Sequence, residues 1–294
     1  MKESLNVSGG DNSRRKFIKN LGILGALAIT APKEIFSQNT IEQIPKTALR
    51  QTSEKFKNGG YVYDFVKENG ERVGEFWPIK GLNLITKQTD PQAFEGTIEE
   101  IQEKLGDKNI VATAPDGMTG GSLGSYKMEG KSLSNGRECG DGEIKNYGIV
   151  IVKNGFDITF THKQEHLNDF DQLYNEVKSD QGTLLFLPSI YRNGKFLPSN
   201  AKIDKALVRR EVPKTSSTPK GEQLGIILFD SLITYDEARE KILGLNRDGK
   251  SFTTHIYMLD GGSNWGQSAK EVNGQVVTKG TRDPSVVTNY LVFY

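Results

Sequence analysis

The chain has 294 residues, of which 35% are hydrophobic, 26% are charged and 32 are glycines, enough to bury one large core between many tight turns. Its formal net charge is +1, and basic residues are interspersed with acidic ones, so we expect no nucleic-acid partner. Cys139 is the only cysteine, so no intramolecular disulfide can form, and its thiol is either a bystander or a reactive group.

The N-terminus has the pattern of an export signal. Residues 13–19 are Ser-Arg-Arg-Lys-Phe-Ile-Lys, and a short apolar segment follows at 21–29. Paired arginines before a short apolar segment are typical of twin-arginine signals, whereas a basic patch beside a buried helix is the alternative. We expect residues 1–38 to be a signal peptide recognised by the twin-arginine export machinery and cleaved after Ala28 or near Gln38. The mature protein would be periplasmic or secreted, with no stable membrane anchor.

Residues 39–58 are polar without periodicity, which predicts a linker before one domain at 59–294. Alternating apolar residues predict strands over 61–66 and 74–86. Asp90-Pro91 is a helix-start signal, and the spacing of the apolar residues that follow predicts one helix ending at Leu105. A buried strand is expected over 109–113, and a glycine-rich, irregular stretch follows over 116–142.

The second half alternates strands with two helices. The predicted strands cover residues 147–152, 156–161, 184–187, 224–229, a segment ending at Asp260, and 286–293. One helix is expected over 165–178, and the capping box of Thr234 and Glu237 begins another that ends near Gly244. Residues 213–220 have a loop composition, and Asn273-Gly274 predicts a hairpin. These elements predict an α+β fold, a single domain with a mixed, mostly antiparallel sheet and about three helices.

A candidate pocket lies where the apolar run over 255–259 stops at Asp260, followed by Gly261, Gly262 and Ser263. An acid at the end of a buried strand lies at the rim of the core, and glycines let a ligand approach the backbone closely. A strand that simply ends in a turn is the alternative, because Asp-Gly is ordinary turn chemistry. Ser263 lacks the Gly-x-Ser-x-Gly context of a hydrolase nucleophile, so a serine triad is not supported.

Two further patterns suggest chemistry. His162, Glu165 and His166 spell H-x-x-E-H, an inverted zinc-protease motif, with Glu237 or Glu240 as an imaginable third ligand. The strand-like alternation that precedes His162 would place the two histidines apart, so a solvated turn is the preferred interpretation.

Several arginines could bind a ligand. Arg209 and Arg210, at a predicted strand end, could clamp a phosphate, or could pair at the surface with Glu211. Arg282 precedes the turn signal Asp283-Pro284, so it faces either a ligand or solvent.

The order of several short motifs resembles the phosphodiester glycosidase domain family, which includes bacterial exported proteins and the mannose-6-phosphate uncovering enzyme. In the last third these are a strand, a threonine-led helix, Leu-Asp-Gly-Gly, an Asn-Gly hairpin and a closing strand, at residues 225–229, 234–238, 259–263, 272–277 and 286–291. Upstream, residues 111–118, 126–131 and 190–195 resemble a strand-turn and two hairpins of the family. The resemblance covers about residues 80–294.

The chain also departs from the family pattern. Pro115 stands beside Asp116 where the family has Asn, and Phe186-Leu187-Pro188 replaces Ser-Gly-Pro. Arg209-Arg210-Glu211 replaces an arginine followed by Thr or Asn, and Ser263-Asn264-Trp265 replaces a third glycine and its following hydroxyl residue. Either the substrate differs from the family's or the active site has degenerated.

The resemblance implies an exported hydrolase of a glycosyl phosphodiester or a related cell-envelope sugar. Asp260 would be the acid/base or substrate-orienting carboxylate, and Arg209 or Arg210 would hold the phosphate. The remaining substrate-binding candidates are Asp116, Gly117, Gly261, Gly262, Ser263, Trp265 and Arg282. Trp265 either stacks on a sugar or fills a core gap. A divalent cation such as calcium is a possible cofactor, although no EF-hand spacing is present. The alternative is a non-catalytic envelope glycan-binding protein with a degenerate active site.

Overall fold

The computed structural model describes residues 44–57, 59–106, 108–112, 132–139, 148–166, 168–196, 201–216, 218–260, 268–279 and 289–294. The chain divides into two units, Met1–Thr40 and Ile41–Tyr294, and all described residues belong to the second. The predicted signal peptide therefore lies outside the described residues. No helix in the described part of the chain is long and apolar enough to cross a bilayer.

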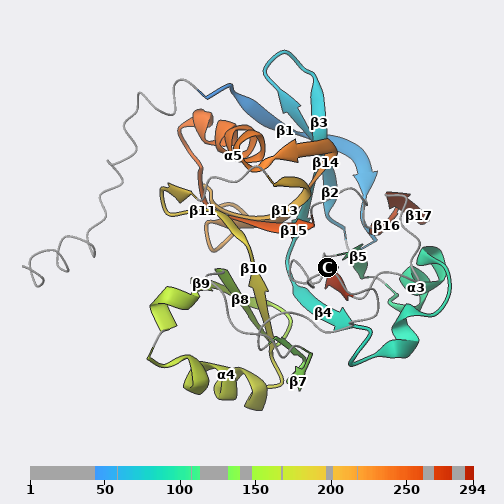
Figure 1. Ribbon diagram of the computed structural model, residues 1–294. Helices are drawn as coiled ribbons and strands as arrows, with labels where there is room; N and C mark the ends of the chain where they lie inside the picture. The colour runs from blue at the N-terminus through green and yellow to red at the C-terminus, as the bar shows by residue number, and fades with distance from the viewer. Residues whose placement is uncertain are drawn as a thin grey trace, which may run out of the picture. The chain divides into compact units, whose positions relative to one another are not determined.

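The largest element is an eight-stranded sheet in the order β1-β2-β3-β14-β13-β15-β11-β12. Every pairing within it is antiparallel (Figure 1). Its strands are β1 (Thr47–Lys55), β2 (Tyr61–Lys67), β3 (Arg72–Ile79), β14 (Glu222–Thr234), β13 (Lys202–Glu211), β15 (Phe252–Asp260), β11 (Ser189–Arg192) and β12 (Lys195–Phe196).

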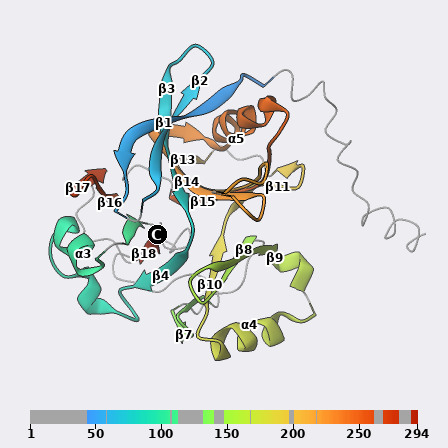
Figure 2. The same ribbon diagram turned by 180° about the vertical axis from the view of Figure 1, so that it is seen from behind.

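The described residues also form two five-stranded antiparallel sheets, each with one helix nearby (Figure 2). The first has the order β7 (Arg137–Glu138), β6 (Leu133–Ser134), β10 (Thr183–Leu187), β8 (Gly148–Lys153) and β9 (Asp157–His162), and it packs against α4 (Phe170–Ser179). The second has the order β17 (Gln275–Lys279), β16 (Ser268–Val272), β5 (Asn109–Ala112), β18 (Asn289–Phe293) and β4 (Leu82–Thr86), and it packs against α3 (Ile98–Lys104).

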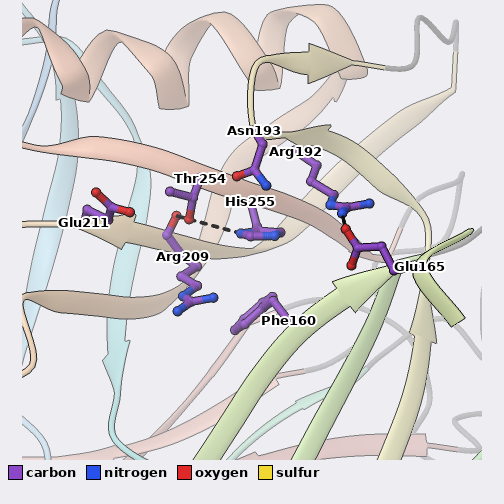
Figure 3. A pocket seen from close by; sticks show the side chains of 8 residues that line it. All are labelled: Phe160, Glu165, Arg192, Asn193, Arg209, Glu211, Thr254 and His255. Carbon is purple, nitrogen blue, oxygen red and sulfur yellow. Dashed lines mark hydrogen bonds and ion pairs between the residues drawn. The ribbon is translucent and has the colours of Figure 1, made fainter. Parts of the chain in front are cut away.

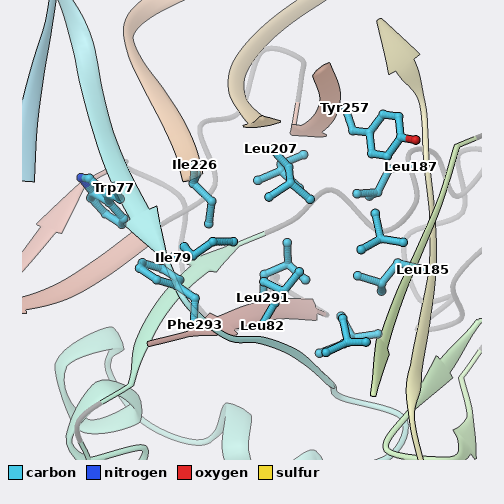
Figure 4. Close-up of a cluster of buried hydrophobic side chains, with 14 of the residues drawn as sticks. Trp77, Ile79, Leu82, Leu185, Leu187, Leu207, Ile226, Tyr257, Leu291 and Phe293 are labelled. Atoms are coloured by element: carbon cyan, nitrogen blue, oxygen red, sulfur yellow. The ribbon is translucent and has the colours of Figure 1, made fainter. Parts of the chain in front are cut away.

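One continuous apolar core joins the three sheets (Figure 4). The large sheet contributes alternate residues such as Trp77, Leu207 and Tyr257, because side chains two apart on a strand share a face. Leu185 comes from the first small sheet and Leu291 from the second. The predicted α+β class with mostly antiparallel strands and about three helices is confirmed, but the strands of the described residues form three sheets rather than one.

The opposite face of the large sheet is covered by α5 (Tyr235–Leu243) and the 3-10 turn η4 (Gly244–Asp248). The Thr234 side chain accepts a hydrogen bond from the Glu237 backbone N–H, and the Glu237 carboxylate accepts one from Thr234, as the capping box predicted. Ala238 and Ile242 are buried on this face. Successive residues of β13 therefore alternate between the face toward the three-sheet core and the face covered by α5 and η4.

The predicted linker over 39–58 is wrong from Thr47 onward, because β1 (Thr47–Lys55) pairs with β2 at the edge of the large sheet. An edge strand has one neighbour and much of β1 is solvent-exposed, so its sequence Thr-Ala-Leu-Arg-Gln-Thr-Ser-Glu-Lys lacks the alternation of a half-buried strand.

The single helix predicted up to Leu105 is also wrong. It consists of a 3-10 turn, η1 (Pro91–Phe94), and the separate helix α3, because Gly96 between them has a φ of 104° and Thr97 begins a second capping box. The helix predicted over 165–178 begins later, at Phe170, after the 3-10 turn η3 (Lys163–His166). The hairpin at Asn273-Gly274 is confirmed, and both residues have positive φ, as a type I′ turn requires.

Candidate functional site

A polar pocket of about 240 Å³ lies where β9 of the first small sheet meets the large sheet (Figure 3). This volume is below the roughly 300–1,000 Å³ of pockets that hold drug-sized ligands. The chain passes from β10 into β11 with a single residue, Pro188, between them, which fixes the two sheets against each other. The lining residues are Phe160, Glu165, Arg192, Asn193, Arg209, Glu211, Thr254 and His255.

Three of these residues form a row across adjacent strands of the large sheet. His255 on β15 is directly opposite Arg209 on β13 and directly opposite Arg192 on β11. Residues directly opposite in antiparallel strands project from the same face. Two guanidinium groups therefore flank one imidazole, and Figure 3 shows the imidazole between them.

A β-bulge shapes the pocket beside this row. Arg209 pairs with His255 and Arg210 with Thr253, so Thr254 is the additional residue on β15. The Thr254 backbone carbonyl accepts a hydrogen bond from the Asn193 N–H at 2.9 Å. Asn193 belongs to the Asn-Gly turn between β11 and β12 and has a φ of 43°. The bulge and the turn together place Thr254 and Asn193 in the lining.

The hydrogen bonds of His255 assign its tautomer. The Thr254 hydroxyl donates its single proton to the Arg209 carbonyl, at 3.2 Å. The same oxygen lies 3.0 Å from His255 Nδ1, so Nδ1 carries the hydrogen and donates it to Thr254. Nε2 is then an unprotonated acceptor, and this side of the ring is turned toward Arg192 and Glu165 (Figure 3).

Burial, together with the smaller effect of the positive charges of Arg209 and Arg192, lowers the pKa of His255 from 6.5 to about 3. His255 is 5% exposed, and its ring centroid lies 5.3 Å from that of Phe160. The imidazole is therefore neutral at pH 7.

Carboxylates hold both arginines of the row. Arg192 pairs with Glu165 of η3, and Arg209 pairs with Glu222 of β14. Glu165 is itself anchored, because its other oxygen accepts a hydrogen bond from the Thr161 hydroxyl at 2.7 Å. An arginine has five N–H donors, so these contacts fix each guanidinium and leave donors for a ligand. Within the lining, two cations are balanced by the carboxylates of Glu165 and Glu211.

Of the two arginines predicted to hold a phosphate, the pocket contains Arg209 and not Arg210. Arg210 follows Arg209 on the same strand, so it projects from the other face, which η4 covers. Its guanidinium is buried and donates to the Ser251 hydroxyl at 2.6 Å and to the Leu245 carbonyl at 3.3 Å. Burial lowers the pKa of Arg210 to about 10. Arg210 therefore stabilises the packing of η4 and does not line this pocket, and its assignment as a phosphate ligand stays a prediction.

Asp260 ends β15, and its backbone pairs with Lys205 on β13, whereas Arg209 pairs with His255. Asp260 lies five positions along the strand from His255, about 16 Å at the usual rise of about 3.3 Å per residue. The structure thus places the Asp260 backbone at the end of β15, away from the row that contains Arg209 and His255. The Asp260 side chain and the other substrate-binding candidates, Asp116, Gly117, Gly261, Gly262, Ser263, Trp265 and Arg282, lie outside the described residues.

The H-x-x-E-H segment does not form one helix face. His162 ends β9 and His166 ends η3, as the sequence favoured. His162 is buried, however, and its Nδ1 accepts a hydrogen bond from the Gln164 backbone N–H at 3.2 Å. Glu237 belongs to the capping box of α5. No cluster of three or more His, Cys, Asp or Glu among the described residues is arranged to hold a metal ion. The divalent cation stays a prediction with no assigned ligands.

Cys139 is fully buried, and burial raises the pKa of its thiol to about 12. A thiol that stays protonated at neutral pH is a poor nucleophile. Of the two interpretations of this cysteine, the structure supports the bystander.

The sequence missed most of the pocket. Arg192, Asn193, Thr254 and His255 lie on strands or turns whose pairing brings them together only in the folded chain. The local signals near the site were the Asn-Gly turn at residues 193–194, the Arg-Arg-Glu segment at 209–211 and the H-x-x-E-H motif. Glu165 was noted only as part of the H-x-x-E-H motif, and its ion-pair partner, Arg192, is 27 residues away in the sequence.

Comparison of the sequence with models of known protein families finds no match, and comparison with curated proteins finds none either. The site therefore has to be interpreted from its own geometry.

Proposed function

We propose that this protein is exported and binds a sugar of the cell envelope that carries a phosphodiester, with the phosphodiester between Arg192 and Arg209. The row of Arg192, His255 and Arg209 supports this proposal most strongly. The planar fork of a guanidinium can hold two oxygens of a tetrahedral phosphoryl group, and two guanidinium groups approach the pocket from opposite sides.

The charge of the lining favours a diester over a doubly charged monoester. Glu165 and Glu211 balance the two arginines within the lining, and Glu222 pairs with Arg209 from outside it, so the pocket has no excess positive charge to offset a dianion. A phosphodiester carries a single negative charge. The Asn193 amide and the Thr254 hydroxyl supply a donor and acceptors that suit sugar hydroxyls, and the pocket volume of about 240 Å³ suits a ligand the size of about one sugar ring.

The test is binding of purified mature protein to a panel of sugar-1-phosphodiesters and their parent sugars, measured by calorimetry. We expect Arg209→Gln and Arg192→Gln to weaken phosphodiester binding at least about tenfold, the loss of one charge-assisted hydrogen bond. Arg50→Gln is the matched control, because Arg50 is an exposed arginine on β1 of the same sheet. If both pocket variants bind every panel member as tightly as the wild type, the proposal is wrong.

Hydrolysis of the glycosyl phosphodiester, with Asp260 as the acid/base, is the second candidate function. One observation favours it: Lys205, opposite Asp260, is buried with its ammonium 3.1 Å from the Asp204 carboxylate. Buried charged groups at the end of an apolar strand are the kind of environment that tunes a catalytic carboxyl. Turnover by the wild type that is lost in Asp260→Asn, with binding retained, would support hydrolysis. If the protein binds panel members but hydrolyses none of them, the result would reject hydrolysis and favour the binding protein.

A further inference from the structure

His255 is the buried titratable group at the centre of the pocket. In the free protein it is neutral, with Nδ1–H donated to Thr254 and Nε2 left as an acceptor. His255 lies between Arg192 and Arg209 in the row, so an oxyanion held by the two arginines would lie over His255. The ligand would then bring an acceptor oxygen toward an acceptor nitrogen, and two lone pairs repel each other unless a proton lies between them.

We propose that an oxyanion bound between Arg192 and Arg209 is bound together with a proton, which His255 takes up at Nε2. The proton comes from solvent, a single N–H bond forms, and no other covalent bond changes. The resulting imidazolium donates at Nδ1 to Thr254 and at Nε2 to the ligand. This inference rests on the proposed function, since it concerns the ligand of the same pocket.

Burial is the largest cause of the low pKa of His255 in the empty pocket, and the charges around the ring decide how a bound anion changes it. Arg209 from β13 and Arg192 from β11 both oppose protonation in the empty pocket. Glu165 from η3 and Glu211 from β13 line the same pocket and favour it, while Glu222 from β14 reaches the row through its pair with Arg209. Phe160 from β9 and Tyr257 on β15 pack against the ring as uncharged groups. A bound anion offsets the two arginines and removes the main repulsion.

The experiment measures binding of dimethyl phosphate and of sulfate to the whole mature protein between pH 5 and pH 7.5. Neither anion changes its own charge in this interval, so any pH dependence belongs to the protein. We expect the affinity to rise as the pH falls, by up to about tenfold per pH unit, the limit for one linked proton. Calorimetry in buffers of different ionisation enthalpy should count uptake of up to one proton. The dimethyl phosphate arm tests a diester, and the sulfate arm tests a generic oxyanion.

His255→Gln keeps a polar side chain but cannot gain a proton, so its affinity should lose this pH dependence. His166→Gln is the matched control, since His166 contacts Asp169 and Thr161 and does not line the pocket. A measurement on the wild type alone avoids any folding defect: the His255 ring signals in an NMR titration should shift to those of imidazolium at a higher pH when the anion is present.

Affinity that is constant from pH 5 to pH 7.5, or an unchanged pH dependence in His255→Gln, would overturn the inference. So would failure of both anions to bind at every pH. These outcomes differ from failure of the proposed function, which is judged by the effect of Arg192→Gln and Arg209→Gln on the sugar panel.

Discussion

Acid should destabilise this fold through His255 in particular. The pKa of the folded-state imidazole, about 3, lies well below the ordinary value of 6.5. Below pH 6.5 the unfolded chain binds a proton that the folded chain does not, so stability is full above that pH and is lost as the pH falls toward 3. One pKa unit corresponds to about 1.4 kcal/mol, so His255 should lower the free energy of unfolding by about 2 kcal/mol between pH 6.5 and pH 5.

The assay is urea unfolding of the wild type, His255→Gln and His166→Gln at intervals between pH 7.5 and pH 5. The difference between wild type and His255→Gln isolates this residue from the carboxylates, which titrate in all three proteins. A smaller slope should remain in His255→Gln, because burial and Arg192 also lower the pKa of His162. The reasoning is refuted if His255→Gln loses as much stability between pH 6.5 and pH 5 as the wild type does.

Four structural predictions follow from other contacts. Lys270→Met should lower the free energy of unfolding by about 3 kcal/mol in denaturant, because the Lys270 ammonium is buried 2.6 Å from the Glu54 carboxylate and 3.0 Å from that of Glu75. Lys57→Met, at an exposed ion pair, is the control, and a smaller loss in Lys270→Met than in Lys57→Met would contradict this. Gly148→Ala should cost about 1–3 kcal/mol, because a Cβ there would lie 2.6 Å from the Tyr257 ring, and a thermal midpoint equal to that of the wild type would count against it. Thr234→Ala should cost about 1 kcal/mol through loss of the α5 cap, and Thr218→Ala in an exposed loop provides the comparison. Cys139 should resist a thiol reagent at pH 8 until the chain unfolds; rapid labelling of the native protein would show that the thiol is accessible.

Local signals in the sequence determined much of the secondary structure. The capping box at Thr234, the Asn273-Gly274 turn and the alternating apolar strands depend on residues within a few positions of one another, so they can be recognised without the fold. Edge strand β1 was missed because its solvent-exposed residues follow no alternation. The break at Gly96 was missed because the apolar spacing continues across it and hides a glycine with positive φ.

The pocket, in contrast, was decided by the tertiary structure. Arg209 and Arg210 are adjacent and chemically identical in the sequence, yet one lines the pocket and the other is buried against η4. Neighbouring residues of a strand project from opposite faces of the sheet, so the two arginines point in opposite directions. What packs against each face decides which of them can contact a ligand. Arg192 and His255 are 63 residues apart, and their meeting depends on the pairing of β11 with β15, which no local pattern encodes. The sequence could supply the charged residues of a site, but strand register selected which of them act together.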